Sequence, residues 1–120
     1  MSTLDGRNIL IVEDSPVVAP FTAELLGELG CVVVGPAPNI ATARELIETA
    51  KIDAAIMDIN IRGERVFPMC ELLEARGIPF VLTSGYSGLA VPPKWADRPR
   101  LPKPYAIADV EAALAKLFED

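Results

Sequence analysis

The sequence predicts a single α/β domain built around a doubly wound parallel sheet. Short apolar runs, each the length of a buried strand, alternate along the 120 residues with longer segments whose apolar side chains recur at helical spacing. Glycine or proline separates several of these segments. Strands that alternate with helices at this interval form right-handed βαβ units, which assemble into a parallel sheet with helices on both faces.

The first predicted strand and helix lie in the first quarter of the chain. The run Ile9–Val12 is typical of a strand that is buried on both faces. Ser15 is the predicted N-cap of the following helix and Pro16 its first residue, because a serine oxygen accepts from a free helical N–H and proline has none to leave unpaired. Gly30 is expected to end this helix. The predicted inward stripe consists of Val17, Phe21, Leu25 and Leu29.

Two more strands and the helix between them follow. Val32–Val34 is predicted to be a strand that stops at Gly35-Pro36. The next helix is expected to begin at Asn39, and Ala54–Met57 is the third strand, which delivers Asp58 at its end. The residues of this helix that are expected to face inward are Ile40, Ala43, Ile47 and Ala50.

The last third of the chain is predicted to contain a less regular connection. A helix over Val66–Arg76 precedes a fourth strand, Phe80–Leu82. Because adjacent prolines interrupt a helix, the fourth helix is expected to be short or irregular. Pro102 places the fifth strand at the sheet edge. The final helix is expected to turn Ile107, Val110, Leu114 and Leu117 inward.

Composition excludes several classes of function. Eleven basic and seventeen acidic residues give a net charge of −6 without a Lys/Arg cluster, which argues against nucleic acid or an anionic membrane as the main partner. The sequence shows neither a membrane span nor a signal peptide, so the predicted compartment is the cytoplasm. The absence of histidine excludes Ser-His and Cys-His nucleophiles. Cys31 and Cys70 are predicted to be reduced, buried thiols.

Residues with reactive side chains follow the predicted strands. The carboxyl ends of the strands in an open α/β sheet border the crevice in which ligands bind. Carboxylates that meet there repel one another, and Mg²⁺ relieves that repulsion. Asp14 and Asp58 are the predicted direct ligands, with Glu13 acting through water and the Asn60 main-chain carbonyl completing the set. The residues expected to meet at this edge are Glu13, Asp14, Asp58, Asn60, Thr83 and Lys103.

The same edge predicts phosphoryl chemistry. A carboxylate can attack phosphorus and form an acyl phosphate, and Asp58 is the candidate because it stands alone at its strand end. Mg²⁺, Lys103 and Thr83 would stabilise the charge on the phosphoryl oxygens. Each residue alone has an ordinary explanation as a turn or helix cap. The prediction depends on four of five strand ends carrying the required residue types.

Over essentially its whole length, the chain resembles the receiver domain of two-component response regulators. The matching segments, in order, are Ile9–Asp14, Asp58–Asn60, Thr83-Ser84 and Lys103-Pro104. The resemblance implies a flavodoxin-like five-stranded sheet of order 2-1-3-4-5 and a cis peptide between Lys103 and Pro104. It also implies Mg²⁺-dependent phosphorylation of Asp58 by a sensor histidine kinase or histidine phosphotransfer protein, with Thr83 reorienting toward the phosphoryl group.

A narrower resemblance concerns the segment Pro79–Tyr86, which is similar to the signature of the "FAT GUY" receivers and departs from it at Leu82 and Ser84. Ordinary receivers carry an aromatic residue three positions before the lysine, where this chain has Arg100. Tyr86 is therefore a candidate switch residue together with Thr83, the alternative being simple packing. Trp95 is interpreted either as a partner contact or as a local packing residue.

The sequence thus predicts a stand-alone cytoplasmic receiver over residues 1–120, without an output domain, that assists its own phosphorylation and dephosphorylation and is not an enzyme in the usual sense. One alternative is a pseudo-receiver, an interaction module of the same fold that is never phosphorylated. A flavin or nucleotide binder would need a phosphate-binding loop after the first strand, where Glu13 and Asp14 stand. A haloacid-dehalogenase phosphatase would need an aspartate where Asn60 stands.

Overall fold

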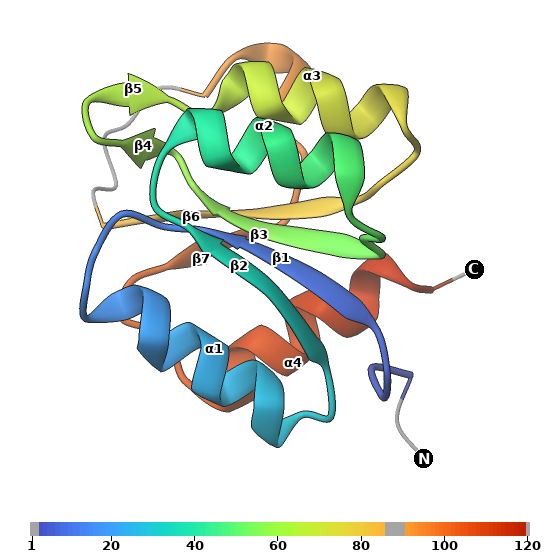
Figure 1. The fold of residues 1–120 in the computed structure, drawn as a ribbon. Helices are drawn as coiled ribbons and strands as arrows, with labels where there is room; N and C mark the ends of the chain where they lie inside the picture. Colours follow the sequence, from blue (N-terminus) through green and yellow to red (C-terminus); the bar gives the residue numbers. More distant parts are fainter. Residues whose placement is uncertain (1–2, 86–90, 120) are drawn as a thin grey trace.

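The computed structural model describes residues 3–85 and 91–119. A five-stranded parallel sheet of order β2-β1-β3-β6-β7 lies between two layers of helices, with α2 and α3 on one face and α1 and α4 on the other (Figure 1). The strands are β1 Asn8–Val12, β2 Val32–Ala37, β3 Ala54–Asp58, β6 Phe80–Ser84 and β7 Arg100–Pro102, and the helices are α1 Val18–Glu28, α2 Ile40–Thr49, α3 Phe67–Ala75 and α4 Ile107–Leu117. This arrangement confirms the predicted doubly wound order and places β7 at the edge.

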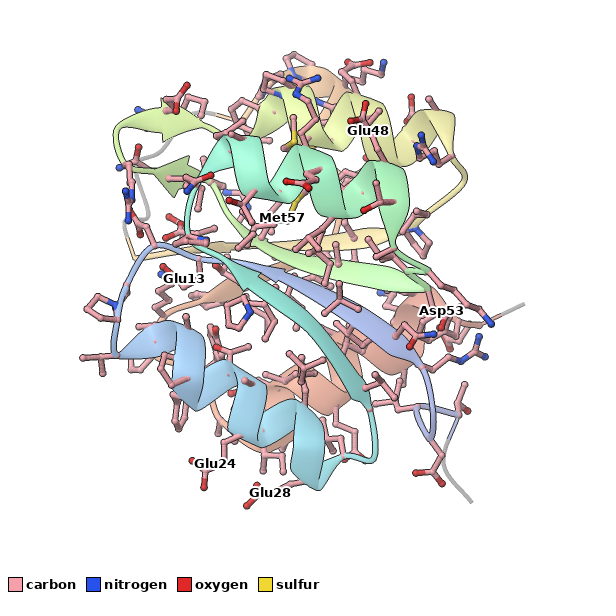
Figure 2. All side chains as sticks on the ribbon, viewed as in Figure 1. Glu13, Glu24, Glu28, Glu48, Asp53 and Met57 are labelled. Carbon is pink, nitrogen blue, oxygen red and sulfur yellow. The ribbon has the colours of Figure 1, made fainter. Side chains whose placement is uncertain are left out.

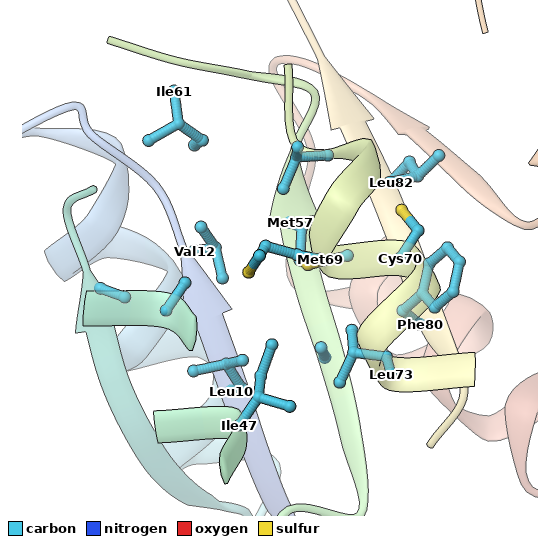
Figure 3. Packing of buried hydrophobic residues seen from close by; sticks show 14 of the residues in the cluster. Leu10, Val12, Ile47, Met57, Ile61, Met69, Cys70, Leu73, Phe80 and Leu82 are labelled. Atoms are coloured by element: carbon cyan, nitrogen blue, oxygen red, sulfur yellow. The ribbon is translucent and has the colours of Figure 1, made fainter. Parts of the chain in front are cut away.

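The core consists of two apolar layers, because side chains alternate between the faces of each strand. Leu10 and Val12 of β1 pack with α2 and α3, whereas Ile9 and Ile11 pack with α1 and α4. Figure 3 shows the first layer, in which Met57 lies between the strands and α3. Both faces of β1 and β3 are thereby buried, so these strands hold the site from the centre of the sheet.

The strand register brings the carboxyl ends together. Val12 pairs with Met57 across β1 and β3, and Asp58 pairs with Thr83 across β3 and β6. Leu101 of β7 pairs with Thr83. The predicted site residues therefore reach one edge of the sheet, on the side where the β4–β5 hairpin lies in Figure 1.

The second strand is longer than predicted. It runs through Gly35-Pro36 to Ala37, and the register with β1 shifts between Leu10 and Val12. Gly35 has φ +92°, and a Cβ there would lie 2.8 Å from the Ala37 nitrogen, so glycine is required. The Gly-Pro step makes an irregularity in β2 instead of ending it, and both Gly35-Pro36 and Lys103-Pro104 are cis.

The inward stripe predicted for α1 is wrong in its first half. Val17 is 75% exposed and Phe21 45% exposed, while the buried residues of α1 are Ala19, Thr22, Leu25 and Leu26. The polar Thr22 faces inward because its hydroxyl forms a 2.6 Å hydrogen bond with the hydroxyl of Tyr105. The predicted start of the helix is also wrong: α1 begins at Val18 with Val17 as its N-cap, and Pro16 precedes the helix. Ser15 Oγ still accepts from the amides of Val17 and Val18, just before and at the first helical residue.

The segments around α3 contain a feature that the sequence pattern did not predict. A two-stranded hairpin, β4 Asn60–Ile61 and β5 Glu64–Arg65, links β3 to α3. Between β6 and β7, the described residues form a single 3₁₀ turn, η1 Pro93–Trp95, in agreement with the predicted short or irregular fourth helix.

The structure also tests the predictions for two apolar side chains. Ile107, predicted to face inward, is 36% exposed at the first residue of α4, where a helix has no preceding turn to cover it. Trp95, left open between a partner contact and packing, is only 2% exposed and is a packing residue in this structure. Among the described residues, no helix is long and apolar enough to cross a membrane.

Candidate functional site

Lys103 joins two of the predicted site carboxylates. Its Nζ donates to Glu13 Oε1 at 2.6 Å and to Asp58 Oδ2 at 2.9 Å. Glu13 directly follows β1, Asp58 is the last residue of β3, and Lys103 comes from the loop after the edge strand β7. Figure 2 shows Glu13 at one end of the sheet, opposite the end at which Asp53 lies. Three segments that are far apart in sequence therefore meet in one ion-pair network.

The three acidic residues form a compact cluster. One carboxylate oxygen each from Glu13, Asp14 and Asp58 lie within 4.8 Å of one another. Asp14 is further oriented by the Arg62 amide, which donates to its Oδ2 at 2.8 Å, and Glu13 accepts from the Ser15 amide at 3.1 Å. Backbone amides from the following loop and the hairpin thus hold these side chains in place.

Thr83 and Asn60 lie beside Asp58. Thr83 is directly opposite Asp58 in the β3–β6 register, and its carbonyl accepts from the Ile59 amide at 3.1 Å. The Asn60 amide makes a long 3.4 Å contact with Asp58 Oδ1, while Asn60 Oδ1 is a buried atom for which the described residues provide no hydrogen-bond partner. Both residues therefore stand where the sequence predicted them.

Burial and charge oppose each other in this network. Burial raises the pKa of Glu13 above its ordinary value of 4.5, and the hydrogen bond from Lys103 offsets this only in part. For Lys103, burial lowers the pKa, but the hydrogen bonds to Glu13 and Asp58 together with the negative charges of these two groups outweigh burial, and the net direction is upward. Lys103 is therefore charged at neutral pH, and it neutralises one of the clustered negative charges.

The residues present fit a hard divalent cation. Three carboxylates face one another with one ammonium to balance them, and Asn60, two residues after Asp58, has a buried side-chain oxygen for which the described residues provide no hydrogen-bond partner. Mg²⁺ prefers oxygen ligands of this kind and uses few carboxylates at a time. Glu13, Asp14 and Asp58 are the carboxylates available to such an ion.

Two contacts escaped the sequence analysis. The Arg62 amide reaches Asp14 because Arg62 has φ +51° at the turn of the hairpin, and the adjacent Gly63 is the only local sequence signal for that turn. Tyr105 is tied to α1 through Thr22, and burial raises the pKa of the Tyr105 phenol. A proline-flanked Tyr carries no signal for such a partner. Tyr86, the predicted switch aromatic, lies outside the described residues.

Comparison with known proteins identifies the family. A sequence model of the response regulator receiver domain matches residues 9–94. The chain belongs to this family. The receiver domain is also 31% identical over 112 residues to the transcriptional regulatory protein PdtaR of Mycobacterium tuberculosis, an alignment that covers 90% of this chain and 55% of PdtaR. It thus spans about half the length of the curated relatives it matches.

Solved structures agree with this assignment. The solution structure of SdrG from Sphingomonas melonis Fr1 matches with a TM-score of 0.86 and 42% identity, covering 99% of this receiver domain and all of that chain. The solution structure of the BeF3-activated conformation of SdrG matches with a TM-score of 0.82. The receiver domain of sensor histidine kinase PA1611 from Pseudomonas aeruginosa, with magnesium coordinated in its active-site cleft, has a TM-score of 0.80 at 23% identity, covers 92% of this chain and 96% of its own, and shows the same fold.

Proposed function

We propose that this receiver domain is a phosphorylation-dependent switch that accepts a phosphoryl group on Asp58. The observation that carries the proposal is the position of Asp58 at the end of a central strand, 2.9 Å from the Lys103 ammonium and within a cluster of three carboxylates. The donor would be a phosphohistidine on a sensor histidine kinase or a histidine phosphotransfer protein, in the cytoplasm.

Asp58 would act as the nucleophile. Lys103 Nζ donates to Oδ2, whereas among the described residues Oδ1 makes only the long contact with the Asn60 backbone amide and is the freer oxygen. A carboxylate oxygen attacks phosphorus and forms the O–P bond of an acyl phosphate, while the P–N bond to the donor imidazole breaks and the nitrogen keeps the electron pair. Only 9% of Asp58 is exposed, so the donor must approach from the open edge of the sheet.

Mg²⁺ would be held by Asp14 and Asp58, by Glu13 through water and by the main-chain carbonyl of Asn60. When bound, the ion supplies positive charge to the phosphoryl oxygens. The magnesium in the PA1611 receiver supports the same choice of ion for this fold. Lys103 and the Thr83 hydroxyl would donate to the remaining oxygens, and Thr83 would move toward the phosphoryl group as the switch. Tyr86 stays a predicted partner of Thr83 in that movement.

An exposed apolar surface next to the site supports a protein donor. Val17 and Phe21 project from the start of α1, and Phe21 borders a cavity of about 380 Å³ that reaches Lys103. The other residues lining this cavity are Val18, Gly85, Pro104 and Tyr105. Exposed apolar side chains beside a reactive group are typical of an interface with another protein. A small phosphate donor would need no such surface.

Intact-mass spectrometry after incubation with acetyl phosphate, with and without Mg²⁺, tests the proposal. We expect one Mg²⁺-dependent phosphate adduct that is lost in Asp58→Asn. Asp53→Asn is the matched control, because it removes a carboxylate next to the opposite end of β3 (Figure 2). It should keep the adduct.

If acetyl phosphate gives no adduct, a panel of phosphorylated histidine kinases replaces it as the donor. Absence of an adduct from every donor would contradict the proposal and favour the pseudo-receiver alternative, an interaction module of the same fold that is never phosphorylated.

A further inference from the structure

The β4–β5 hairpin ends in a turn whose first residue is strained. The two residues of the turn, Arg62 and Gly63, have φ of +51° and +84°. Positive φ at both central positions is the pattern of a type I′ turn, in which asparagine, aspartate or glycine usually takes the first position. Arg62 is the only residue other than glycine with a positive φ in the part of the chain that the structure describes. Because a Cβ crowds the following carbonyl in this conformation, contacts elsewhere must hold the arginine in it.

The Arg62 backbone amide has such a contact. It donates to Asp14 Oδ2 at 2.8 Å, although the two residues are 48 positions apart in the sequence. The hairpin lies on the same side of the sheet as the loop that follows β1 and carries Asp14 (Figure 1). The Arg62 side chain is exposed, so the group that Arg62 contributes to the site is its backbone N–H.

The base of the hairpin is fixed to the core. The Ile59 amide donates to the Thr83 carbonyl at 3.1 Å, and the Val66 amide donates to the Ile59 carbonyl at 2.9 Å. The side chains of Ile59, Ile61 and Val66 are fully buried. Because a group is held most precisely by a packed and hydrogen-bonded support, this base presents the Arg62 amide to Asp14 in a fixed position.

Asp14 depends on this amide more than its two neighbours would. Lys103 pairs with Glu13 and Asp58, whereas Asp14 has no salt-bridge partner within residues 3–85 and 91–119. An amide is neutral, so it orients the Asp14 carboxylate and leaves its negative charge available to a cation. Hydrogen bonds of this kind fix the orientation of metal ligands and raise metal affinity.

We propose that the turn of the β4–β5 hairpin is a positioning element for Mg²⁺ binding, in which the Arg62 backbone amide holds Asp14 Oδ2 and leaves Oδ1 free for the cation. This inference rests on the proposed function, in which Asp14 is a direct Mg²⁺ ligand. Gly63 supports the same turn, since glycine adopts a φ of +84° without strain. Loss of the turn therefore raises the Mg²⁺ concentration that phosphorylation requires.

Gly63→Val tests the proposal, because a β-branched residue rarely adopts a positive φ and the turn must change. Apart from its chain neighbours, a Cβ at Gly63 meets no heavy atom within 4 Å, so the substitution acts through the backbone and not through a clash. We expect isothermal titration calorimetry to show Mg²⁺ binding about tenfold weaker, as is typical when a partner of a metal ligand is lost. With acetyl phosphate, the half-saturating Mg²⁺ concentration should rise by the same factor, and the rate at saturating Mg²⁺ should match the wild type.

Gly77→Val is the matched control. Gly77 has φ +69°, a Cβ there also meets no heavy atom within 4 Å beyond its chain neighbours, and it precedes β6 at the end of the sheet opposite the site. Gly77→Val should lose stability in urea denaturation as Gly63→Val does, and it should keep the wild-type affinity for Mg²⁺. If a valine variant does not fold, alanine at the same two positions replaces it and should show the same difference on a smaller scale.

Arg62→Asn separates the amide from the side chain. Asparagine adopts a positive φ more readily than arginine and keeps the amide, while the positive charge of the guanidinium is removed. This variant should bind Mg²⁺ about twofold more tightly than the wild type, on the scale of one exposed charge.

The outcomes distinguish this inference from the proposed function. Wild-type affinity in Gly63→Val, or equal weakening in Gly63→Val and Gly77→Val, would overturn the inference and leave the proposed function standing. Weaker binding in Arg62→Asn would assign the effect to the guanidinium and would also overturn it. A wild-type protein that binds no Mg²⁺ and forms no adduct with any donor would remove both.

Discussion

Replacing Lys103 by methionine removes the ammonium that lies between Glu13 and Asp58 and keeps a long apolar stem. Its Nζ contacts both carboxylates at 2.6 and 2.9 Å, and its side chain is only 18% exposed. Breaking a buried ion pair by removing one partner leaves uncompensated charge and is strongly destabilising. Lys103→Met should therefore lower the free energy of unfolding.

The size of this loss is limited by protonation. Without Lys103, the folded protein can relieve the repulsion by keeping Glu13 protonated. Starting from the ordinary glutamate pKa of 4.5, this costs at most about 3 kcal/mol at neutral pH and about 1 kcal/mol near pH 5.5. A carboxyl whose pKa is raised by folding destabilises the folded state as pH rises above the unfolded value. The loss in Lys103→Met should thus grow from pH 5.5 to pH 7.

Urea denaturation at these two pH values, with and without Mg²⁺, measures the effect. Mg²⁺ should stabilise Lys103→Met more than the wild type, because the ion meets carboxylates that no ammonium neutralises. Lys51→Met, at an exposed lysine after α2, is the control and should change stability little. A Lys103→Met protein whose stability matches the wild type at pH 7, or whose loss does not depend on pH, would refute this account of the network.

Three further predictions follow from the same structure. Phe21→Ala should reduce the rate of phosphoryl transfer from a histidine kinase about tenfold, as expected for the loss of one interface side chain, and leave the rate of the reaction with acetyl phosphate unchanged. Val32→Ala, at a similarly exposed residue of the edge strand β2, should change neither rate. Thr22→Val should lower the free energy of unfolding by about 1–3 kcal/mol in urea denaturation, because the buried Tyr105 hydroxyl loses its partner; an unchanged midpoint would contradict this. Burial raises the pKa of the Cys70 thiol from 9.0 to about 12, so the thiol ionises first in the unfolded protein and the free energy of unfolding falls as pH rises through 9. Between pH 8 and pH 10, the free energy of unfolding of Cys70→Ala should therefore fall by about 1 kcal/mol less than that of the wild type. An equal fall in both proteins would show that burial does not protect this thiol from ionisation.

The site was predictable because a parallel sheet turns sequence position into spatial position. Apolar runs locate the strands, and the residue after each run must reach the same edge. The positions of Asp58 and Thr83 could be predicted from these runs alone, and the strand register places the two residues directly opposite each other. Lys103 was predictable from its residue type and from the resemblance to receiver domains.

The features that were missed depend on tertiary contacts. The hairpin after Asp58 has two residues per strand, too few for an alternating pattern to appear. The α1 stripe was placed wrongly because the sequence does not reveal that Thr22 has a buried partner 83 residues away. A run of valines that ends at Gly35-Pro36 indicates a stop, whereas pairing with β1 carries the strand on to Ala37. In the last two cases a long-range contact overrode the local pattern.

The measurement that tests the central claim most directly is chemical mapping of the phosphorylated residue. Borohydride reduces an acyl phosphate to an alcohol, so an aspartyl phosphate becomes homoserine at its own position. After phosphorylation with Mg²⁺, reduction and peptide sequencing by mass spectrometry, we predict homoserine at position 58 and at no other aspartate. Homoserine elsewhere, or phosphate retained on Thr83 or another hydroxyl, would contradict the site described here.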